Sequence, residues 1–232
     1  MQRQALNRIP VDILRARVAQ ELRIAILRGD LTPGSRIKQE HLAAQLGVSR
    51  EPVRQALLLL QREGLVHAQP NRGASVAPLD SQLISDVYGL REALETAAVA
   101  TLARSSRFDV RPFRDLIARG RVAVRQRDFR ALVDLDMSFH TSLYEAAGNR
   151  VVVEVMRGQW SQIRRIMSLV ADHFTYRQKI WDEHQAIVEA IHARKVVPAI
   201  AAATRHIRAA RELLIESFDA SAPATPLHAT PH

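Results

Sequence analysis

The segment GSRIKQEHLAAQLGVSREPVRQALLLLQREGLVHAQPNRGASV, residues 34–76, contains two short helical patterns followed by two strand-like pieces. The first helical pattern ends at Gly47, and Ser49 is placed to cap the second, which covers residues 50–64. In the stretch LVHAQPNRGASVAP, a Pro-Asn-Arg-Gly turn separates the two strand-like pieces, which predicts a β-hairpin. Helix, turn, helix and hairpin in this order predict a winged helix-turn-helix.

Helical periodicity also precedes and follows this segment. Apolar residues recur at helical spacing from Val11 to Gly29, which predicts a helix before the helix-turn-helix. Beyond Pro78 the strand patterns stop and six helical stretches follow with short breaks. Their predicted ranges are 80–105, 108–127, 128–147, 149–173, 175–194 and 196–218. The sequence therefore predicts a mainly α protein with an N-terminal winged helix-turn-helix domain and a C-terminal all-α antiparallel six-helix bundle.

The distribution of charge supports a division into two domains. The chain has 232 residues, which is long enough for one large domain or two modest ones. Residues 1–79 carry 12 Lys and Arg against 6 acidic residues, whereas residues 80–232 carry 21 against 18. We expect a DNA-binding domain at 8–79 and a helical domain at 80–218. The Ala/Pro/Thr-rich stretch 219–232 lacks periodicity and is predicted to be a disordered tail.

The composition limits the classes of protein to consider. Hydrophobic residues make up 47% of the chain and aromatic residues only 5%, which favours helices. The net charge is +9 and the isoelectric point is near 11.0, which indicates an anionic partner such as nucleic acid. The absence of cysteine excludes disulfides, thiolate zinc sites and cysteine nucleophiles. The sequence shows no signal peptide or membrane span, so we expect a cytoplasmic protein.

The second helix of the helix-turn-helix has the residues of a DNA-recognition helix. Its first two turns carry Arg50, Glu51 and Arg54, while Val53 and Leu57 can face inward. Arginine can read guanine in the major groove, and a helix N-terminus can bind phosphate. The alternative is a solvated charged helix face, and for the hairpin tip an ordinary exposed turn. The predicted DNA-contacting residues are Arg36, Ser49, Arg50, Glu51, Arg54, Arg72 and Gly73.

The segment 34–76 resembles the winged helix-turn-helix of the GntR family of bacterial transcription regulators. The run Gly-Val-Ser-Arg-x-Pro-Val-Arg-x-Ala-Leu is present without a gap. The resemblance implies that Arg50 and Arg54 are the recognition-helix arginines and that Arg72 and Gly73 form the wing tip. It also implies double-stranded DNA as the partner, with a homodimer bound to a two-fold symmetric operator.

The helical domain contains a set of possible metal ligands. In DLDMSFH, residues 134–140, Asp136 and His140 are four residues apart and would share one helix face. His184 and His206 each lie 11 residues from Lys195, so they would face each other in an antiparallel helix pair. One Asp and three His suit zinc most readily, with nickel or manganese as other possibilities. The alternative is a chance spacing of locally hydrogen-bonded histidines.

Residues 80–218 resemble the FadR-type C-terminal (FCD) domain that many GntR proteins carry. The matching pieces are LREALE (90–95), DMSFH (136–140), AAGN (146–149), EHQAIVEAI (183–191) and RHI (205–207). The resemblance implies a divalent metal ion bound by Asp136, His140, His184 and His206. It also implies that Arg91 contacts the carboxylate of an effector, although an ion pair with Glu95 at i+4 would equally explain this arginine.

The expected function is a DNA-binding transcription regulator, most simply a repressor. A divalent metal ion and a small carboxylic acid, expected to be a di- or hydroxy-carboxylate, would bind the helical domain and change operator affinity. A metal-dependent hydrolase that uses the Asp/His cluster is the alternative from another class, with Glu183 as a general base. A protein that organises chromosomes without an effector is a third possibility. The sequence contains no His-Glu-x-x-His motif, which counts against the hydrolase.

Overall fold

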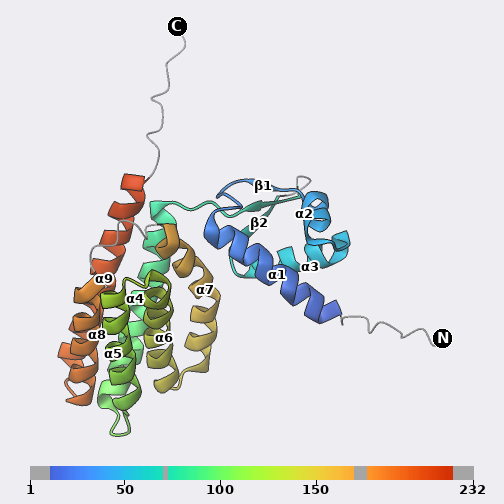
Figure 1. The fold of residues 1–232 in the computed structure, drawn as a ribbon. Coiled ribbons are helices and arrows are strands. Elements are labelled where there is room, and N and C mark those ends of the chain that lie inside the picture. The colour runs from blue at the N-terminus through green and yellow to red at the C-terminus, as the bar shows by residue number, and fades with distance from the viewer. Residues whose placement is uncertain (1–10, 70–72, 170–176, 222–232) are drawn as a thin grey trace. The chain divides into compact units, whose positions relative to one another are not determined.

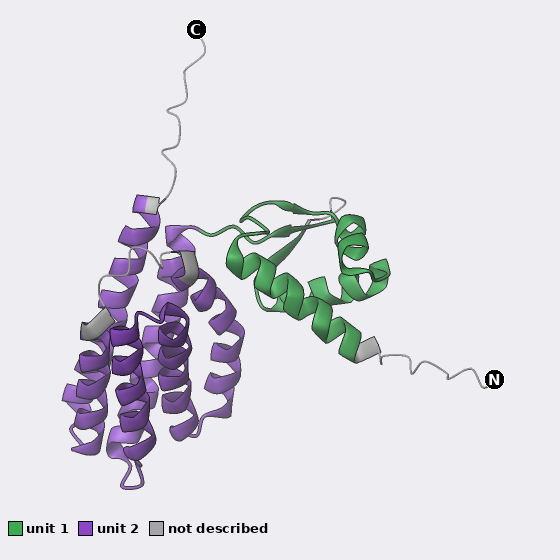
Figure 2. Ribbon diagram, in the orientation of Figure 1, with its two compact units in different colours: residues 1–79 green, residues 80–232 purple. Residues whose placement is uncertain are grey.

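A computed structural model describes residues 11–69, 73–169 and 177–221 of the chain (Figure 1). The chain divides into two compact units, residues 1–79 and 80–232, which Figure 2 shows in different colours. Each unit has its own hydrophobic core. The mainly α architecture predicted from the sequence is confirmed, with a small sheet in the first unit and a helical bundle in the second.

The first unit is a winged helix-turn-helix. Its three strands form an antiparallel sheet in the order β1-β3-β2. The turn between α2 and α3 contains Gly47 in the left-handed conformation, at φ 65°, and its backbone N–H bonds to the end of α2. The elements are α1 (Val11–Arg28), β1 (Arg36–Ile37), α2 (Gln39–Leu46), α3 (Arg50–Arg62), β2 (Val66–Gln69) and β3 (Gly73–Val76).

The core of the first unit is built mainly between α1 and α3. Val18 and Leu22 of α1 pack in the same buried cluster as Val53 and Leu60 of α3. These residues are spaced at helical intervals, so each helix buries one stripe and leaves the opposite face to solvent. The polar N-terminal part of α3 therefore stays at the surface.

Two details of the first unit differ from the sequence prediction. Strand β1 was not predicted, because two residues are too few to show periodicity, yet Arg36 pairs with Ser75 in β3. Ser49 precedes α3 as predicted, but its side chain makes no capping hydrogen bond within the described residues. The predicted hairpin is present, whereas Arg72 at its tip lies outside the described residues.

The second unit is an antiparallel helical bundle, in which α9 packs along α4 and α8 (Figure 1). Asp80 and Asp128 cap α4 and α6 by accepting hydrogen bonds from the backbone N–H groups of Leu83 and Ala131, at 2.7 and 2.9 Å. The helices are α4 (Ser81–Arg104), α5 (Arg111–Gln126), α6 (Phe129–Ala146), α7 (Arg150–Leu169), α8 (Arg177–His192) and α9 (Val196–Ser221). None of the helices in the described ranges has the length and apolarity that a membrane span requires.

The predicted start of the disordered tail at residue 219 is wrong. Helix α9 continues to Ser221, because Leu214 and Ser217 are still buried against the bundle. Ser81 at the start of α4 donates a hydrogen bond to Asp219, which ties the last turn of α9 to the bundle. Residues 222–232 of the predicted tail lie outside the described residues.

Candidate metal centre and DNA-binding surface

Three helices of the bundle bring Asp136, His140, His184 and His206 together. Asp136 and His140 lie one turn apart on α6, so both side chains leave the same face of that helix. His184 on α8 and His206 on α9 face each other across the helix pair, with their Nε2 atoms 3.2 Å apart. One donor atom from each of the four residues lies within 4.8 Å of all the others, and all four residues are buried.

The separations between the donor atoms are those of ligands around one ion. His184 Nε2 lies 3.2 Å from His140 Nε2, and the latter lies 3.4 Å from His206 Nε2. Asp136 Oδ1 lies 3.6 Å from His140 Nε2 and 3.4 Å from His184 Nε2. Nitrogen ligands at about 2.1 Å from a metal ion are roughly 3.0 Å apart in an octahedron and about 3.4 Å apart in a tetrahedron. An ion therefore fits between these side chains without moving them far.

Two carboxylates orient two of the imidazoles. Glu95 Oε1 lies 2.9 Å from His140 Nδ1, and Glu183 Oε2 lies 3.0 Å from His206 Nδ1. Burial opposes ionisation of Glu95, but His140 and Arg91 lower its pKa to about 2, so Glu95 is ionised and must accept the bond. The Nδ1 atoms then carry the protons, and the Nε2 lone pairs point into the cluster. This is the arrangement of metal-binding histidines with carboxylate partners.

His184 is oriented by ring packing rather than by a hydrogen bond. Its Nδ1 is buried and has no hydrogen-bond partner in the described residues. The Phe139 ring stacks on the His184 ring at a centroid distance of 4.0 Å, and the Trp181 ring meets it edge-on at 4.9 Å. Trp181 in turn lies against Gly120 of α5, where a Cβ atom would overlap the indole ring. The glycine therefore permits the position of Trp181, and Trp181 helps to fix the imidazole.

The buried environment shifts the pKa values of the cluster. Burial lowers the pKa of His184 well below its ordinary value, and His206 and His140 lower it further. Burial also lowers the pKa of His206. At His140, burial acts in the same direction, but the carboxylates of Glu95 and Asp136 outweigh it and raise the pKa. The Nε2 atoms of the three histidines form three close nitrogen–nitrogen contacts. A proton on His140 Nε2 can form a hydrogen bond in only one of these contacts, so in the others two lone pairs face each other without a donor.

Arg91 is fully buried beside the cluster and is only partly satisfied. Its Nε lies 3.6 Å from Glu95 Oε2 and its Nη2 lies 4.0 Å from Asp136 Oδ2, so both contacts are ionic rather than hydrogen-bonded. Within the described residues, neither nitrogen has a hydrogen-bond partner. An ion pair with Glu95 was the alternative role considered for Arg91. This ion pair exists, and it leaves the Nε and Nη2 donors of Arg91 available. Buried donors without partners are unfavourable, and a ligand carboxylate would satisfy them.

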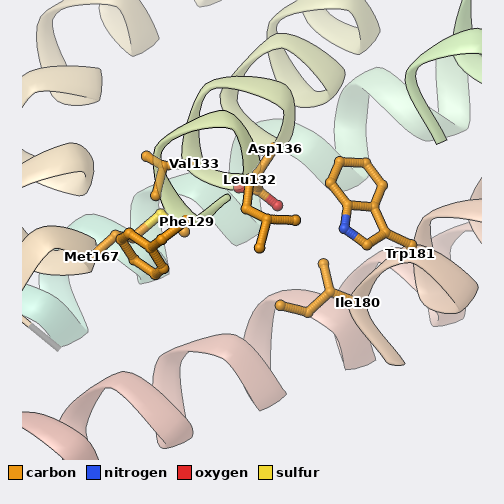
Figure 3. Close-up of a pocket in the computed structure, with 7 residues that line it drawn as sticks. All are labelled: Phe129, Leu132, Val133, Asp136, Met167, Ile180 and Trp181. Atoms are coloured by element: carbon orange, nitrogen blue, oxygen red, sulfur yellow. The ribbon is translucent and has the colours of Figure 1, made fainter. Parts of the chain in front are cut away.

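A small cavity adjoins the cluster at Asp136 (Figure 3). Its volume is about 20 Å³, and among the described residues that line it, Asp136 is the charged one. The other described lining residues are hydrophobic, although Trp181 also carries an indole N–H, and come from α6, α7 and α8: Phe129, Leu132, Val133, Met167, Ile180 and Trp181. The cluster thus has a mostly hydrophobic cavity on one side, and the cationic Arg91 lies near Oδ2 of Asp136.

Several of the predicted DNA-contacting residues lie at one surface of the first unit. Arg36, Lys38, His41 and Arg50 line a groove of about 480 Å³ together with Gly73 of the wing. The exposed basic side chains and the N-terminus of α3 at this surface suit a phosphate backbone. The groove thus combines predicted residues from β1, α3 and the wing.

Arg50 and Arg54, the two arginines predicted to contact DNA from α3, pair with carboxylates of the same unit. Arg54 donates two hydrogen bonds to Glu51, at 2.8 and 2.6 Å, and these bonds lower the pKa of Glu51 to about 2. Arg50 Nη1 lies 2.9 Å from Glu40 Oε1. All four side chains are exposed, so these ion pairs are weak enough to exchange for contacts to DNA.

Sequence reasoning missed the residues that hold the four candidate metal ligands in place. Tyr144 donates a hydrogen bond of 2.8 Å to Glu95 Oε2, so Glu95 is held by a tyrosine as well as by His140. Glu95 is 45 residues from His140 in the sequence, and no spacing rule connects them. Glu183, considered above as a general base, is instead bonded to the imidazole of His206. The sequence offered one indication: a glutamate on the buried face of a bundle helix, such as Glu95, needs a cationic or hydrogen-bond-donating partner.

Comparison with known proteins divides the chain at the same place. Residues 14–76 match the gntR family of bacterial regulatory proteins, and residues 86–209 match the FCD domain. A Streptomyces ambofaciens protein, an uncharacterized HTH-type transcriptional regulator in an unstable DNA locus, is 32% identical over 82% of this chain and 80% of that protein. The Escherichia coli HTH-type transcriptional repressor RspR is 23% identical over 86% of this chain and 88% of that protein.

Solved structures show the same fold. A GntR transcriptional regulator from Rhodococcus matches with a TM-score of 0.70 at 24% identity, over 87% of this chain and 97% of that one. The Escherichia coli protein McbR/YncC matches with a TM-score of 0.71 at 19% identity, over 88% of this chain and 98% of that one.

A winged helix-turn-helix joined to a helical domain of this type defines a DNA-binding transcription regulator rather than an enzyme. The chain belongs to the GntR family of bacterial transcription regulators and carries an FCD C-terminal domain. The metal-dependent hydrolase considered from the sequence therefore has no support.

Proposed function

We propose that this regulator is a repressor that binds one divalent metal ion per chain and a small carboxylate effector in its FCD domain. The effector changes the affinity of a homodimer for a two-fold symmetric operator. Repression is supported by relatives such as RspR, which is named a transcriptional repressor, and the gluconate operon repressor of Bacillus licheniformis, which is 24% identical over 75% of this chain.

The convergence of three imidazole nitrogens and one carboxylate in the bundle carries the proposal. Asp136, His140, His184 and His206 would hold the ion. Asp136 makes ion-pair contacts with His140 and His184 but, in the described part of the chain, none with His206. Three imidazole nitrogens and one carboxylate would suit zinc, and nickel or manganese are the other candidates.

A divalent ion held there would offer a positive charge and open positions to a carboxylate. The two unsatisfied donors of Arg91 support the same ligand, because an arginine can hold the second carboxylate oxygen in a charge-assisted bond. Binding of the ion and the effector would involve residues of α4, α6, α8 and α9 at once. Small shifts of helices are one of the known structural changes in allosteric transitions.

The role of Arg91 can be tested by substitution with lysine. Arg91→Lys keeps a positive charge beside Glu95 and Asp136 but removes the fork of donors, so carboxylate affinity should fall about tenfold while metal content stays the same. Calorimetric titration of the metal-loaded variants measures this, with Arg208→Lys as the control. Arg208 is an exposed arginine that pairs with Glu92. Equal losses in both variants would remove Arg91 from the effector site.

For DNA recognition, the proposed contacts are Arg36, Ser49, Arg50, Glu51, Arg54, Arg72 and Gly73. The groove lined by Arg36, Arg50 and Gly73 and the exposed N-terminus of α3 support this set. Arg50 and Arg54 must leave Glu40 and Glu51 before they reach bases. Binding should weaken steeply with rising salt, because contacts to phosphates release counterions.

Arg54→Ala is expected to weaken operator binding by about 1–3 kcal/mol and to change binding to random DNA much less, because a base contact is lost. Arg62→Ala is the matched control, since Arg62 is an exposed arginine in the last turn of the same helix. Fluorescence anisotropy with operator and random duplexes measures both affinities. Equal losses on the two duplexes would mean that Arg54 contacts phosphate only.

A further inference from the structure

The first two turns of α3 carry a carboxylate on the same face as Arg54. Glu51 and Arg54 are three residues apart, and their side chains are 58% and 52% exposed. A helix-turn-helix places this part of its second helix in the major groove, so Glu51 would enter the groove together with the arginine. Phosphates repel a carboxylate, so Glu51 opposes DNA binding unless it meets a hydrogen-bond donor.

Two neighbours hold the oxygens of Glu51 in different ways. Oε2 accepts a hydrogen bond of 2.8 Å from Arg54 Nε. Oε1 accepts bonds from Arg54 Nη2 at 2.6 Å and from Gln55 Nε2 at 2.8 Å. When Arg54 turns toward DNA, Gln55 still holds Oε1, and Oε2 loses its arginine donor. The carboxylate therefore stays oriented on the helix with one oxygen ready for a new donor.

The base edges of the major groove differ in whether they offer such a donor. Guanine presents N7 and O6 and thymine presents O4 and a methyl group, so neither can donate to a carboxylate there. Adenine presents its N6 amine beside the acceptor N7, which repels a carboxylate. Cytosine presents its N4 amine beside a C–H group instead. Cytosine is therefore the base that suits Glu51 best.

We infer that Glu51 is a specificity-determining residue that accepts a hydrogen bond from a cytosine N4 amine in each operator half-site. Side chains three residues apart on a helix are about 5–6 Å apart, and stacked bases are about 3.4 Å apart. The cytosine thus lies in the base pair next to the one that Arg54 contacts. This inference rests on the proposed function, because it requires a sequence-specific operator. On DNA without this cytosine, the unpaired charge of Glu51 lowers affinity.

The other role open to Glu51 is stabilisation of α3 alone. An ion pair three residues apart and a negative charge near a helix N-terminus both stabilise a helix. Neither effect depends on the sequence of the DNA. Replacement of Glu51 would then lower Tm and leave the preferred operator unchanged, so base preference is the measurement that separates the two roles.

Selection of duplexes from a random library tests the inference without a known operator. Wild-type protein should enrich a two-fold symmetric motif with a cytosine next to the position whose preference is lost in Arg54→Ala. In Glu51→Gln the preferred base should change from cytosine to adenine, because a glutamine amide pairs with adenine N6 and N7. Glu21→Gln is the matched control and should keep the cytosine, since Glu21 is an exposed glutamate on α1.

A modified duplex tests the amine itself. N4-methylcytosine at the selected position still pairs with guanine, but a methyl group replaces the N–H that faces the major groove. Wild-type affinity should fall about fivefold or more, as for a mismatched base pair. Glu51→Ala should bind the methylated and unmodified duplexes about equally. Fluorescence anisotropy measures all four affinities.

The outcomes separate this inference from the proposed function. If Glu51→Gln selects the same motif as wild type, or if the methyl group leaves wild-type affinity unchanged, Glu51 does not contact a cytosine amine and the inference is overturned. Operator binding would then stand without it. If wild-type protein enriches no sequence in either its metal-loaded or its metal-free form, the proposed operator binding itself fails.

Discussion

Replacing His184 with alanine is expected to remove the divalent ion and its contribution to the stability of the helical domain. His184 Nε2 lies 3.2 Å from both other imidazole nitrogens, so it is central to the donor set. Loss of an outer-shell partner typically weakens metal binding 10- to 100-fold, and loss of a direct ligand should exceed about 100-fold. An ion at about 100 times its Kd stabilises the native state by about 2.7 kcal/mol, or roughly 5–10 °C in Tm.

Elemental analysis and thermal unfolding with and without added metal measure this effect. His192→Ala is the matched control, because His192 lies on the same helix but is exposed. It should keep both the ion and the metal-induced rise in Tm. The quantity to compare is the rise in Tm caused by metal, since alanine also removes ring packing against Phe139 and Trp181. An unchanged metal content in His184→Ala would contradict the assigned site.

Gly120→Ala is expected to destabilise the helical domain strongly and to weaken metal binding at the same time. The added Cβ would overlap the indole of Trp181, and the ring packs between α5 and His184. Overpacking of a buried contact costs about 1–3 kcal/mol, and a clash with an aromatic ring should reach the upper part of this range. Relief of the clash must move Trp181, and the Trp181 ring contacts the His184 imidazole.

Gly89→Ala and Gly158→Ala are the controls for this substitution. Both glycines are helical, and a Cβ at either position would meet no atom within 4 Å. Alanine there should stabilise the protein by up to about 1 kcal/mol, because helical glycine is entropically unfavourable. Chemical denaturation gives the free energies, and competition with a metal chelator gives the affinities. A Gly120→Ala protein as stable as wild type would show that Trp181 moves without cost.

Much of the candidate site was predictable because it depends on helix geometry alone. Asp136 and His140 share a face because four residues make about one turn. His184 and His206 lie at one level because they are equidistant from the turn between two antiparallel helices. The recognition-helix position of Arg54 followed from the helix-turn-helix spacing in the same way. Each of these inferences uses distances along one helix or across one short turn.

Other features depend on contacts between residues that are distant in the sequence. Strand β1 has only two residues and exists because Arg36 and Ile37 pair with β3. Helix α9 extends past its predicted end because Ser217 is buried and Asp219 bonds to Ser81 of α4. No local pattern at residues 36–37 or 219–221 indicates these pairings. The partner is supplied by another part of the fold.

The sequence by itself determined the two kinds of domain, the helix faces and the four possible ligands, because these follow from periods of two to four residues and from the positions of turns. Tertiary structure alone decided how the ligands are held: Glu95 and Glu183 orient two imidazoles, and Phe139 and Trp181 hold the third. It also decided that the described residues around the space beside Asp136 are mostly hydrophobic. The physical reason is that hydrogen bonding, ring packing and charge balance in a buried site depend on which helices meet, and spacing within one helix carries no information about its neighbours.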